Sequence, residues 1–333
     1  MSLETIKHYP VMLPQILSII SPQHGGTFID CTFGGGGYSK AILEHPNTKV
    51  IAIDRDKSVK KKAATLIKEF PNRFSFYNEK FSNLDKVAYS KLNVKAIIFD
   101  LGLSRYQLED HERGFSFKSK GSLSMQMGLN KISAYEIVNY LDKTSLSNII
   151  KILGEEKEGK KIANKIAQYR IKKKIETPEE LSGIIKGAKR NNFKINPATK
   201  TFQALRIIVN NELTELIEGL IAATKILNTD GILILVSFHS LEDRIIKNFF
   251  KLHSSLKSNP SRYIPQTPNS NNQNLFKFFQ KKALTPSDYE IKVNHPSRSA
   301  KLRYAIRNNA KFSYSKTMNT KFNKYTNIEK LAS

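Results

Sequence analysis

Four consecutive glycines, Gly34–Gly37, follow a short apolar segment, Gly26–Cys31, and precede residues with helical spacing at 39–44. Glycine backbone adopts conformations that are closed to other residues and approaches a ligand closely, presenting its N–H groups at the start of a helix. A strand, a glycine turn and a helix in this order are typical of the first unit of a nucleotide-binding parallel sheet. The run therefore predicts a ligand site at the turn, with a purely structural tight turn as the alternative.

The rest of the first hundred residues alternates in the same manner. Strand-sized apolar segments lie at Lys49–Asp54, Phe74–Tyr77 and Val94–Leu101, and a helical pattern lies at Ser58–Phe70. Strands that alternate with helices of about ten residues favour parallel βαβ units. We therefore expect an α/β fold whose sheet carries the glycine turn at its carboxyl edge.

Strand patterns vanish between about Gln107 and Leu205, where helical periodicity takes over. A helical stretch at 202–227, with a possible break, then leads to a strand at Gly231–Phe238 and a helix at 242–251. Because a strand returns after the helices, the pattern favours a helical insertion in one sheet domain over two consecutive domains. The expected division is a first part of the sheet domain at 1–106, an insertion for substrate recognition at 107–205, the second part at 206–309, and a basic, disordered tail at 310–333.

The identity of the ligand is constrained by what the loop lacks. Ser39 stands where the dinucleotide fingerprint G-x-G-x-x-G needs its third glycine, and no Gly-Lys-Ser/Thr follows to form a phosphate-binding P-loop. Asp54 closes the second strand, where a carboxylate accepts the hydroxyls of a ribose. An adenosine without a phosphate fits this pair, which predicts S-adenosylmethionine, with Asp30 or Asp100 as an acid near its cationic end. A helix cap is the alternative role for Asp54.

Composition narrows the class of partner. The chain of 333 residues holds 54 Lys+Arg against 29 Asp+Glu, a net charge of +25, and 40% of its residues are hydrophobic. Such a charge favours polyanions, and the apolar fraction is sufficient for a packed core. The charge alone predicts a nucleic acid as the partner and no membrane, with a merely soluble basic protein as the alternative; RNA, and no DNA, is implied only by the resemblance that the longer motifs below carry.

Cysteine and histidine usage exclude other classes of site. The single cysteine, Cys31, excludes an internal disulfide and an all-cysteine zinc site, and no His/Cys/Asp cluster has the spacing of metal ligands. No apolar run approaches the length that spans a bilayer. These features favour a reducing compartment, most simply the cytoplasm, and predict no metal.

Five longer motifs carry a resemblance to a known family. They are HYPVML from His8, DLGLSRYQLEDHERGFSF from Asp100, NPATKTFQALR from Asn196, SFHSLEDR from Ser237 and RSAKLR from Arg298. Together they resemble the ribosomal RNA small subunit methyltransferase H family, the MraW-like 16S rRNA cytosine-N4 methyltransferases, over about residues 6–308. The resemblance implies a Rossmann-like class I S-adenosylmethionine-dependent methyltransferase sheet with an inserted all-helical domain. It also implies methyl transfer to N4 of one cytidine of the decoding centre.

The resemblance further implies a set of cofactor-binding residues: Gly36, Gly37, Tyr38, Asp54, Phe81, Asp100 and Gln107. Tyr38 would contact the cofactor, Asp54 its ribose and Phe81 its adenine. Some positions differ from the family pattern: Tyr38 replaces a histidine, Arg105 a serine, Ser124 and Gln126 an Asp and an Arg, and Asn196 a histidine. The absence of both charges at 124 and 126 suggests that an internal salt bridge of the family is missing here.

The resemblance implies N4 as the methylated position of cytosine, and the nucleophiles that are present disfavour carbon 5. Methylation of carbon 5 needs a cysteine thiolate, and Cys31 lies in the cofactor loop, where a buried packing role is expected. Direct in-line displacement at the sulfonium carbon needs only an aligned amine and an acceptor for its proton. We take Asp100 as the candidate catalytic residue, with cofactor binding alone as its alternative role. His239 is a further candidate for contact with base or phosphate, or a structural hydrogen-bonder.

Basic side chains are expected to contact RNA phosphates, and a solvated helix face is the alternative for each. The candidates are Lys172, Lys173, Lys174, Lys189, Arg190, Arg298, Lys301 and Arg303. Two other functions stay open: a non-enzymatic RNA-binding assembly factor with a degenerate pocket, and an NAD-linked oxidoreductase, which the broken fingerprint disfavours. Ser254–Asn274, rich in Ser, Asn and Pro, is expected to be a mobile loop.

Overall fold

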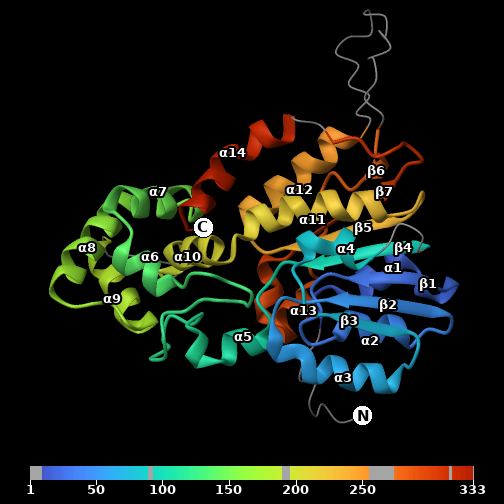
Figure 1. Cartoon of the computed structure of the whole chain (residues 1–333), viewed down its shortest axis with the longest axis horizontal. Coiled ribbons are helices and arrows are strands. Elements are labelled where there is room, and N and C mark those ends of the chain that lie inside the picture. Colours follow the sequence, from blue (N-terminus) through green and yellow to red (C-terminus); the bar gives the residue numbers. More distant parts are fainter. Residues whose placement is uncertain (1–9, 89–92, 190–195, 255–273, 315–316, 333) are drawn as a thin grey trace, which may run out of the picture. The chain divides into compact units, whose positions relative to one another are not determined.

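A computed structural model describes residues 10–88, 93–189, 196–254, 274–314 and 317–332 (Figure 1). The chain divides into two compact units. The first, here called the sheet unit, comprises Met1–Gly102 and Leu216–Asn319, and the second, the helical unit, comprises Leu103–Glu215 and Thr320–Ser333. The insertion predicted over 107–205 lies inside the helical unit, and the chain returns to the sheet unit after it.

The sheet unit is built on seven strands. They are β1 (Gly26–Asp30), β2 (Thr48–Ile53), β3 (Phe74–Tyr77), β4 (Val94–Asp100), β5 (Ile232–Ser237), β6 (Phe276–Phe279) and β7 (Lys301–Arg307). Their order is β3-β2-β1-β4-β5-β7-β6, in which β1 to β5 pair in parallel and β7 is antiparallel to both neighbours. This arrangement confirms the predicted α/β sheet. The order reverses between β1 and β4, which is where open sheets of this kind bind ligands, outside the carboxyl ends of the strands.

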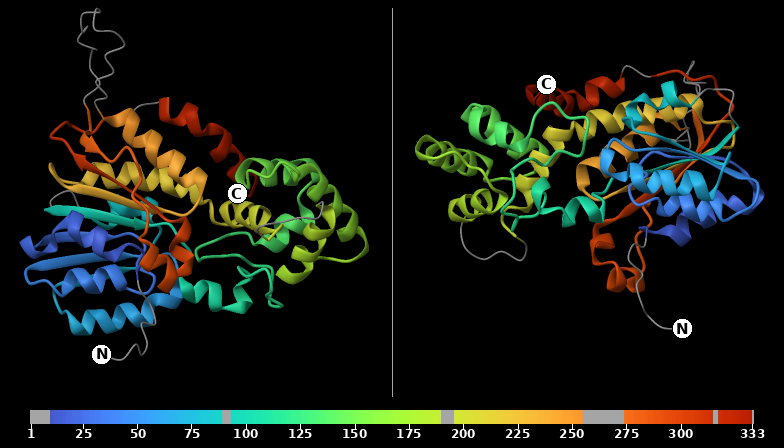
Figure 2. Two further views of the ribbon diagram at one scale, coloured as in Figure 1. Left: turned by 180° about the vertical axis from the view of Figure 1, so that it is seen from behind. Right: turned by 60° about the horizontal axis from the view of Figure 1, so that its bottom comes forward.

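Helices cover both faces of the sheet (Figure 2). The sheet unit contains α1 (Leu13–Ile20), α2 (Gly37–Leu43), α3 (Lys60–Glu69), α4 (Leu84–Val87), α12 (Ser240–His253), α13 (Asp288–Val293) and most of α11 (Glu212–Ile226). Alternate residues of the strands face α1, α2 and α3 in one buried apolar cluster, which includes Phe28, Ala52 and Ile98. Since side chains alternate along a strand, a buried parallel strand needs apolar residues on both faces, and the near-continuous apolar runs of β4 and β5 satisfy this need.

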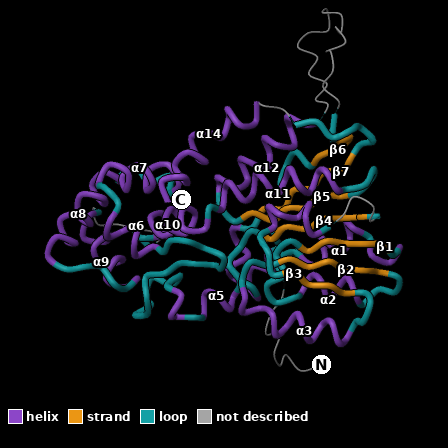
Figure 3. The backbone as a smooth tube through the Cα atoms, viewed as in Figure 1, coloured by secondary structure: helices purple, strands orange, loops and turns teal. Residues whose placement is uncertain are grey.

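The helical unit contains no strand within its described residues (Figure 3). Its helices are α5 (Arg105–Glu109), α6 (Ala134–Tyr140), α7 (Lys143–Leu153), α8 (Gly159–Lys172), α9 (Pro178–Ala188), α10 (Thr199–Asn210) and most of α14 (Thr317–Glu329). Helices α7, α8 and α9 each bury one apolar stripe, as their 3.6-residue periodicity predicts. The predicted break in the 202–227 helix is confirmed at Asn211, whose left-handed backbone (φ 50°) separates α10 from α11.

Short 3₁₀ turns complete the chain: η1 (Pro22–His24), η2 (Lys57–Val59), η3 (Phe81–Asn83), η4 (His111–Arg113), η5 (His295–Ser299) and η6 (Lys330–Ala332). The interior of the predicted mobile loop, 255–273, lies outside the described residues. No helix in the described ranges has both the length and the apolar character needed to traverse a bilayer.

The C-terminal segment corrects the expectation of a disordered tail. Helix α14 spans Thr317–Glu329, and within it Phe322 and Tyr325 are buried. Glu329 is 1% exposed, and its carboxylate accepts hydrogen bonds from the backbone N–H groups of Leu213 (2.9 Å) and Thr214 (2.8 Å). The sequence did not predict this helix, because the segment is mostly polar and its few apolar residues show no clear helical periodicity.

Candidate active site

Asp54 and the glycine loop are bound to each other. The Gly34 N–H donates to Asp54 Oδ2 at 2.7 Å, and the Asp56 N–H donates to Asp54 Oδ1 at 2.8 Å. Each carboxylate oxygen has a second lone pair, so Asp54 can still accept hydrogen bonds from a ligand. Asp54 is not a helix cap: Asp56 has that role and accepts the Ser58 N–H at 2.9 Å.

Two of the predicted site glycines are required by close contacts. Gly36 has a left-handed backbone (φ 78°), and a Cβ there would lie 2.9 Å from the Phe33 ring. A Cβ on Gly37 would lie 2.2 Å from Pro10 Cγ. A Cβ atom essentially never lies within 3.0 Å of another heavy atom to which it is not bonded, so any other residue at these positions would force the loop or its neighbours to shift.

Tyr38 and Asp100 meet at the same edge of the sheet. Tyr38 is 4% exposed, and its hydroxyl lies 2.5 Å from the Val11 carbonyl oxygen and 3.2 Å from Asp100 Oδ2. The other oxygen of Asp100 accepts the Gly102 N–H at 3.3 Å, and the Asp100 N–H donates to Thr32 Oγ1 at 2.7 Å. The geometry therefore brings two predicted site residues into contact.

Asp30, which is buried, and Asp54 and Asp100, which are half-buried, form a set of acids at the ends of parallel strands. Burial raises the pKa of Asp30 and of Asp54 to about 6. Burial, and after it the charges of Asp30 and Glu242, raise the pKa of Asp100 to about 7. Within the described part of the chain, no lysine or arginine contributes to these three shifts. A cationic ligand would stabilise the ionised carboxylates, so the set fits a sulfonium or an ammonium group.

Asp30 and Asp100 are not equivalent. Asp30 is fully buried, and its carboxylate accepts hydrogen bonds from Ser39 Oγ at 2.7 Å and from the Thr32 N–H at 3.2 Å. Asp100 is only partly buried. Of the two acids that the sequence offers for the cationic end of a ligand, Asp100 is therefore the accessible one, and Asp30 fixes the turn between β1 and α2.

Phe81 and Gln107 lie in different units. Phe81 follows β3 in the sheet unit, half-buried, with its ring edge-on to Phe99 at 5.3 Å between centroids. Gln107 belongs to the helical unit, where it is 7% exposed and forms a capping box with Ser104 at the start of α5. The spacing Ser104-x-x-Gln107 is the signature of such a box and was readable in the sequence.

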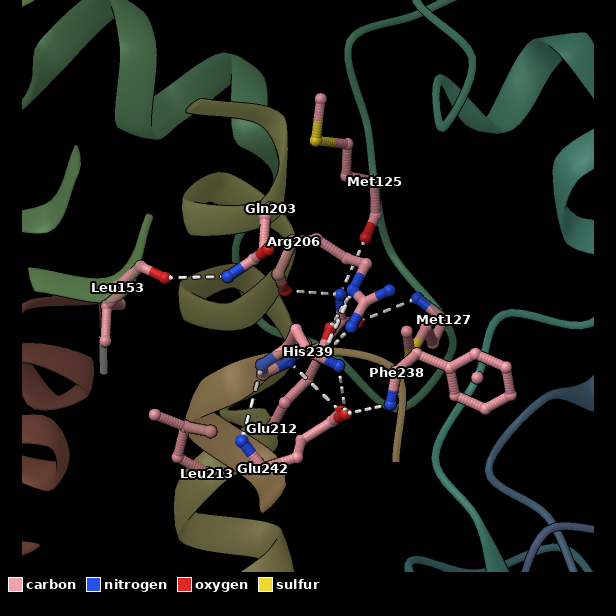
Figure 4. Close-up of polar contacts among 12 residues, drawn as sticks. Met125, Met127, Leu153, Gln203, Arg206, Glu212, Leu213, Phe238, His239 and Glu242 are labelled. Atoms are coloured by element: carbon pink, nitrogen blue, oxygen red, sulfur yellow. Dashed lines mark hydrogen bonds and ion pairs between the residues drawn. The ribbon is translucent and has the colours of Figure 1, made fainter. Parts of the chain in front are cut away.

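His239 is the N-cap of α12 (Figure 4). Its Nδ1 accepts the Glu242 N–H at 3.4 Å, and the Glu242 carboxylate accepts the Phe238 N–H at 2.9 Å and the His239 N–H at 3.3 Å. The structure thus gives this residue the structural role that the sequence left open. In the helical unit, the same figure shows Arg206 paired with Glu212 at 2.7 Å.

Sequence reasoning missed the residues that orient Asp100 and Tyr38. Thr32 receives the backbone N–H of Asp100, and Val11 supplies the carbonyl under Tyr38. A Cβ on Gly102 would lie 2.7 Å from the Phe238 ring, which fixes the chain directly after Asp100. The only signal for these residues was their membership of the motifs around Asp30, His8 and Ser237.

Two of the predicted RNA contacts are corrected. Lys189 is bound inside the protein by Glu156 Oε2 at 2.6 Å, with 10% of its side chain exposed. Arg303 is 5% exposed and donates to Asp243 Oδ1 at 2.7 Å. Arg190 lies outside the described residues.

The other predicted contacts have exposed side chains: Lys172, Lys173, Lys174, Arg298 and Lys301. Lys173 pairs with Glu180 at 2.7 Å, and Lys301 lies 3.7 Å from Asp243 Oδ2. The ammonium group of Lys174 lies over the exposed ring of Tyr140, 4.3 Å from its centroid. Lys172, which is exposed, and Lys174, beside an accessible aromatic ring, are therefore the best-placed cations in this set.

Comparison with known proteins shows the family to which the chain belongs. The model of the MraW methylase family matches residues 5–308. The chain belongs to the MraW methylase family. It is similar to proteins named ribosomal RNA small subunit methyltransferase H. The one from Sulfurihydrogenibium sp. (strain YO3AOP1) is 44% identical, over 91% of this chain and 99% of that protein. The one from Ehrlichia canis (strain Jake) is also 44% identical, over 90% of this chain and 99% of that protein. The counterpart from Rickettsia africae (strain ESF-5) is 43% identical, over 90% and 97%.

Membership of the MraW methylase family supports S-adenosylmethionine as the cofactor that the sequence predicts. The residues present fit this group on two counts. A partly buried carboxylate, Asp54, with lone pairs to spare follows β2, and the acidic charges of Asp30 and Glu242 lie near Asp100 at the end of β4. The family resemblance thus agrees with the chemistry of the donor set.

Four of the five positions that differ from the family pattern make polar contacts within this MraW-family chain, and the side chain of the fifth, Arg105, lies outside the described part of the structure. Ser124 Oγ lies 3.3 Å from Gln126 Oε1, so a neutral hydrogen bond joins the two positions where an opposite-charge pair was expected. Asn196 Oδ1 accepts the Ala198 N–H at 2.9 Å and so supports the start of α10. Tyr38 replaces the expected histidine and makes the contacts with Val11 and Asp100.

Proposed function

We propose that this protein methylates the exocyclic N4 amine of a specific cytidine in 16S ribosomal RNA near the decoding centre, with S-adenosylmethionine as methyl donor. The observation that carries the proposal is the arrangement of Asp54 and Asp100 at the carboxyl ends of β2 and β4, the two strands that flank β1, beside a glycine loop shaped for close approach. The names of the curated relatives, which specify ribosomal RNA of the small subunit, and the net charge of +25 support the substrate class. A ribosomal substrate also favours the cytoplasm as the site of action.

In the cofactor-binding part of the proposal, Asp54 accepts the ribose hydroxyls while the Gly34 and Asp56 N–H groups hold its carboxylate still. Gly36 and Gly37 keep the loop close to the sheet, because their missing side chains leave room for Phe33 and Pro10. Phe81, half-exposed on η3, offers a ring face for the adenine. Gln107 is proposed as a further contact, from the family resemblance alone.

In the chemical part, S-adenosylmethionine would supply a methyl group bound to a sulfonium. The amine nitrogen attacks the methyl carbon in line with the carbon–sulfur bond, which breaks and releases a neutral thioether, so no covalent enzyme intermediate is needed. The lone pair of a cytosine N4 amine is delocalised into the ring, so an acceptor for its N–H groups assists its attack. Asp100 is that acceptor and takes up the proton that the amine releases. A pKa of about 7 suits this role, because general bases work best near the operating pH.

Methylation at carbon 5 of cytosine is disfavoured by the position of the thiol. Cys31 is 1% exposed at the end of β1, and burial raises the pKa of its thiol well above the usual value. A thiol that is both buried and protonated is a poor nucleophile. The amine route needs no enzyme nucleophile and is therefore the better fit to these residues.

The test of the proposal is the substitution Asp100→Asn. Single-turnover methylation of isolated small subunits, with S-adenosylmethionine at saturation, should fall by about 100-fold or more, the scale of general-base catalysis. Asp230→Asn, which changes an exposed carboxylate of the same unit, is the matched control and should leave the rate unchanged. An Asp100→Asn rate near that of the wild type would remove Asp100 from the proton-accepting role.

A further inference from the structure

The segment Pro10–Met12 belongs to the HYPVML motif, to which the proposed reaction assigns no role. Each of its residues is nevertheless bound at the cofactor loop or close to it. Pro10 fills the space beside Gly37, the Val11 carbonyl oxygen lies 2.5 Å from the Tyr38 hydroxyl, and the Met12 N–H donates to Glu290 Oε1 at 2.7 Å. The segment therefore lies along the glycine loop as a fixed strap.

The strap is held firmly enough to act as an anchor. Met12 has a left-handed backbone (φ 54°), which is uncommon for a residue other than glycine and persists only where its surroundings impose it. Those surroundings are its fully buried side chain in the sheet core and its carbonyl oxygen, which accepts the Ile16 N–H at 3.0 Å at the start of α1. The Val11 carbonyl is thereby a fixed acceptor rather than a mobile one.

The Tyr38 hydroxyl has one proton and two oxygen neighbours. Its shorter contact is to the Val11 carbonyl oxygen, which cannot donate, so this bond takes the tyrosine proton. The longer contact, 3.2 Å to Asp100 Oδ2, is then satisfied when a protonated Asp100 donates to the phenol oxygen. When Asp100 is ionised, the tyrosine proton turns toward it instead. One hydroxyl thus serves both protonation states of the acid.

The charges that face this pair are all acidic. Asp30 and Glu290 are near Tyr38, and Asp30 and Glu242 are near Asp100. Asp30 closes β1, Glu290 is on α13 and Glu242 is on α12. Because these charges disfavour an ionised Asp100, the Tyr38 hydroxyl donor is a group that can stabilise it.

We propose that Tyr38 is a positioning residue that couples Asp100 to the Pro10–Met12 strap: its hydroxyl lies between the two, donates to the Val11 carbonyl while Asp100 is protonated, and donates to Asp100 when that carboxylate is ionised and ready to accept a proton. The inference rests on the proposed function, in which Asp100 accepts the proton of the amine. It differs from the expectation that the side chain of residue 38 binds the cofactor, because both neighbours of the Tyr38 hydroxyl are protein oxygens.

Tyr38→Phe tests the coupling, since it removes one oxygen and keeps the ring that packs in the core. Loss of the donor should make Asp100 harder to ionise, so the acid limb of the single-turnover pH profile should move about one pH unit higher, a tenfold loss of rate on that limb. The dissociation constant for S-adenosylmethionine should stay within about threefold of wild type, because Asp54 is untouched. Tyr289→Phe, at a residue 72% exposed on α13, is the matched control and should change neither quantity.

An unchanged profile in Tyr38→Phe would overturn the proposal, as would a rise in the dissociation constant for S-adenosylmethionine with an unaltered profile, which would make Tyr38 a cofactor ligand.

A measurement without substrate separates this proposal from the proposed function. The Asp100 carboxyl carbon can be titrated by NMR in the protein alone, in the wild type and in Tyr38→Phe. A higher midpoint in the variant supports the coupling even if no cytidine is methylated, and equal midpoints contradict it. Failure of the wild type to methylate small subunits would instead contradict the proposed function.

Discussion

At the scale of single residues, the glycine loop and the acids of the sheet edge determine each other's positions. Gly34 donates to Asp54, Gly36 lies against Phe33 and Gly37 against Pro10. Because each contact is close, the shape of the loop requires residues without a side chain at positions 36 and 37. The cofactor contacts predicted at 36 and 37 are therefore backbone contacts.

The substitution Gly37→Ala tests whether the close packing of Gly37 against Pro10 determines the shape of the loop. A Cβ at 2.2 Å from Pro10 Cγ forces the strap or the loop to move, which should lower the free energy of unfolding by about 1–3 kcal/mol. It should also weaken S-adenosylmethionine binding, measured by calorimetry. Gly187→Ala on α9, where nothing lies within 4 Å of the added carbon, is the control and should stabilise the protein by about 0.5–1 kcal/mol. Equal effects of the two substitutions would contradict the packing argument.

The same scale shows what the sequence could predict of the site. Asp54 was identifiable because it ends an apolar strand, and Asp100 because it ends another and begins a long motif. The contact of Tyr38 with Val11 and Asp100 was not, since it joins residues separated by 27 and 62 positions, and no local pattern records such a meeting. The burial of Lys189 and Arg303 was hidden for the same reason: their partners, Glu156 and Asp243, are distant in sequence.

At the scale of elements, periodicity predicted those that bury one clean stripe or a continuous apolar run. The strand β3 has the bounds that the pattern indicated, Phe74–Tyr77. The strand β7 was missed because Arg303 and Arg307 occupy buried positions and interrupt its apolar alternation. Arg303 pairs there with Asp243, and Arg307 donates to the carbonyl oxygens of Thr224 and Leu275, so burial is compensated by polar contacts.

Helix α14 lies beyond the residues that match the family, and its residue Glu329 should make the free energy of unfolding depend on pH. Burial raises the pKa of Glu329 from an ordinary 4.5 to about 8. Between these values the folded protein holds a proton that the unfolded chain has released, so stability falls as pH rises through this window. The loss is at most about 1.4 kcal/mol per pH unit for one proton.

Glu329→Gln removes this titration and should flatten the dependence of the unfolding free energy on pH between about 5 and 8, measured by urea titration. The exposed carboxylate of Glu179 on α9 offers a control, and Glu179→Gln should keep the wild-type slope. A Glu329→Gln slope identical to that of the wild type would show that this carboxyl group titrates normally in the folded protein.

At the scale of the whole molecule, the net charge of +25 acts over long distances, but only accessible cations contact phosphate. Lys172 and Lys174 qualify, since both are exposed and Lys174 stacks on Tyr140. Lys189 and Arg303 do not, and their replacement should act through stability.

The salt dependence of RNA binding measures whether particular exposed lysines contact phosphate. The double variant Lys172→Ala/Lys174→Ala should weaken binding to small-subunit RNA and reduce the slope of log K against log salt by about one for each phosphate that the variant no longer binds. A double variant with the same change of charge at exposed lysines of α3, Lys61→Ala/Lys68→Ala, should leave the slope near that of the wild type. Equal slopes in the two double variants would assign RNA binding to overall charge alone.

The central claim is that the acids of this sheet edge direct a methyl group to a cytosine amine in ribosomal RNA. Purified protein, small ribosomal subunits lacking the modification and isotopically labelled S-adenosylmethionine test it in one measurement, mass spectrometry of the nucleosides after digestion. The account predicts that the label appears in N4-methylcytidine at a single position. Label in 5-methylcytidine, in a ribose methyl group or in no nucleoside would contradict it.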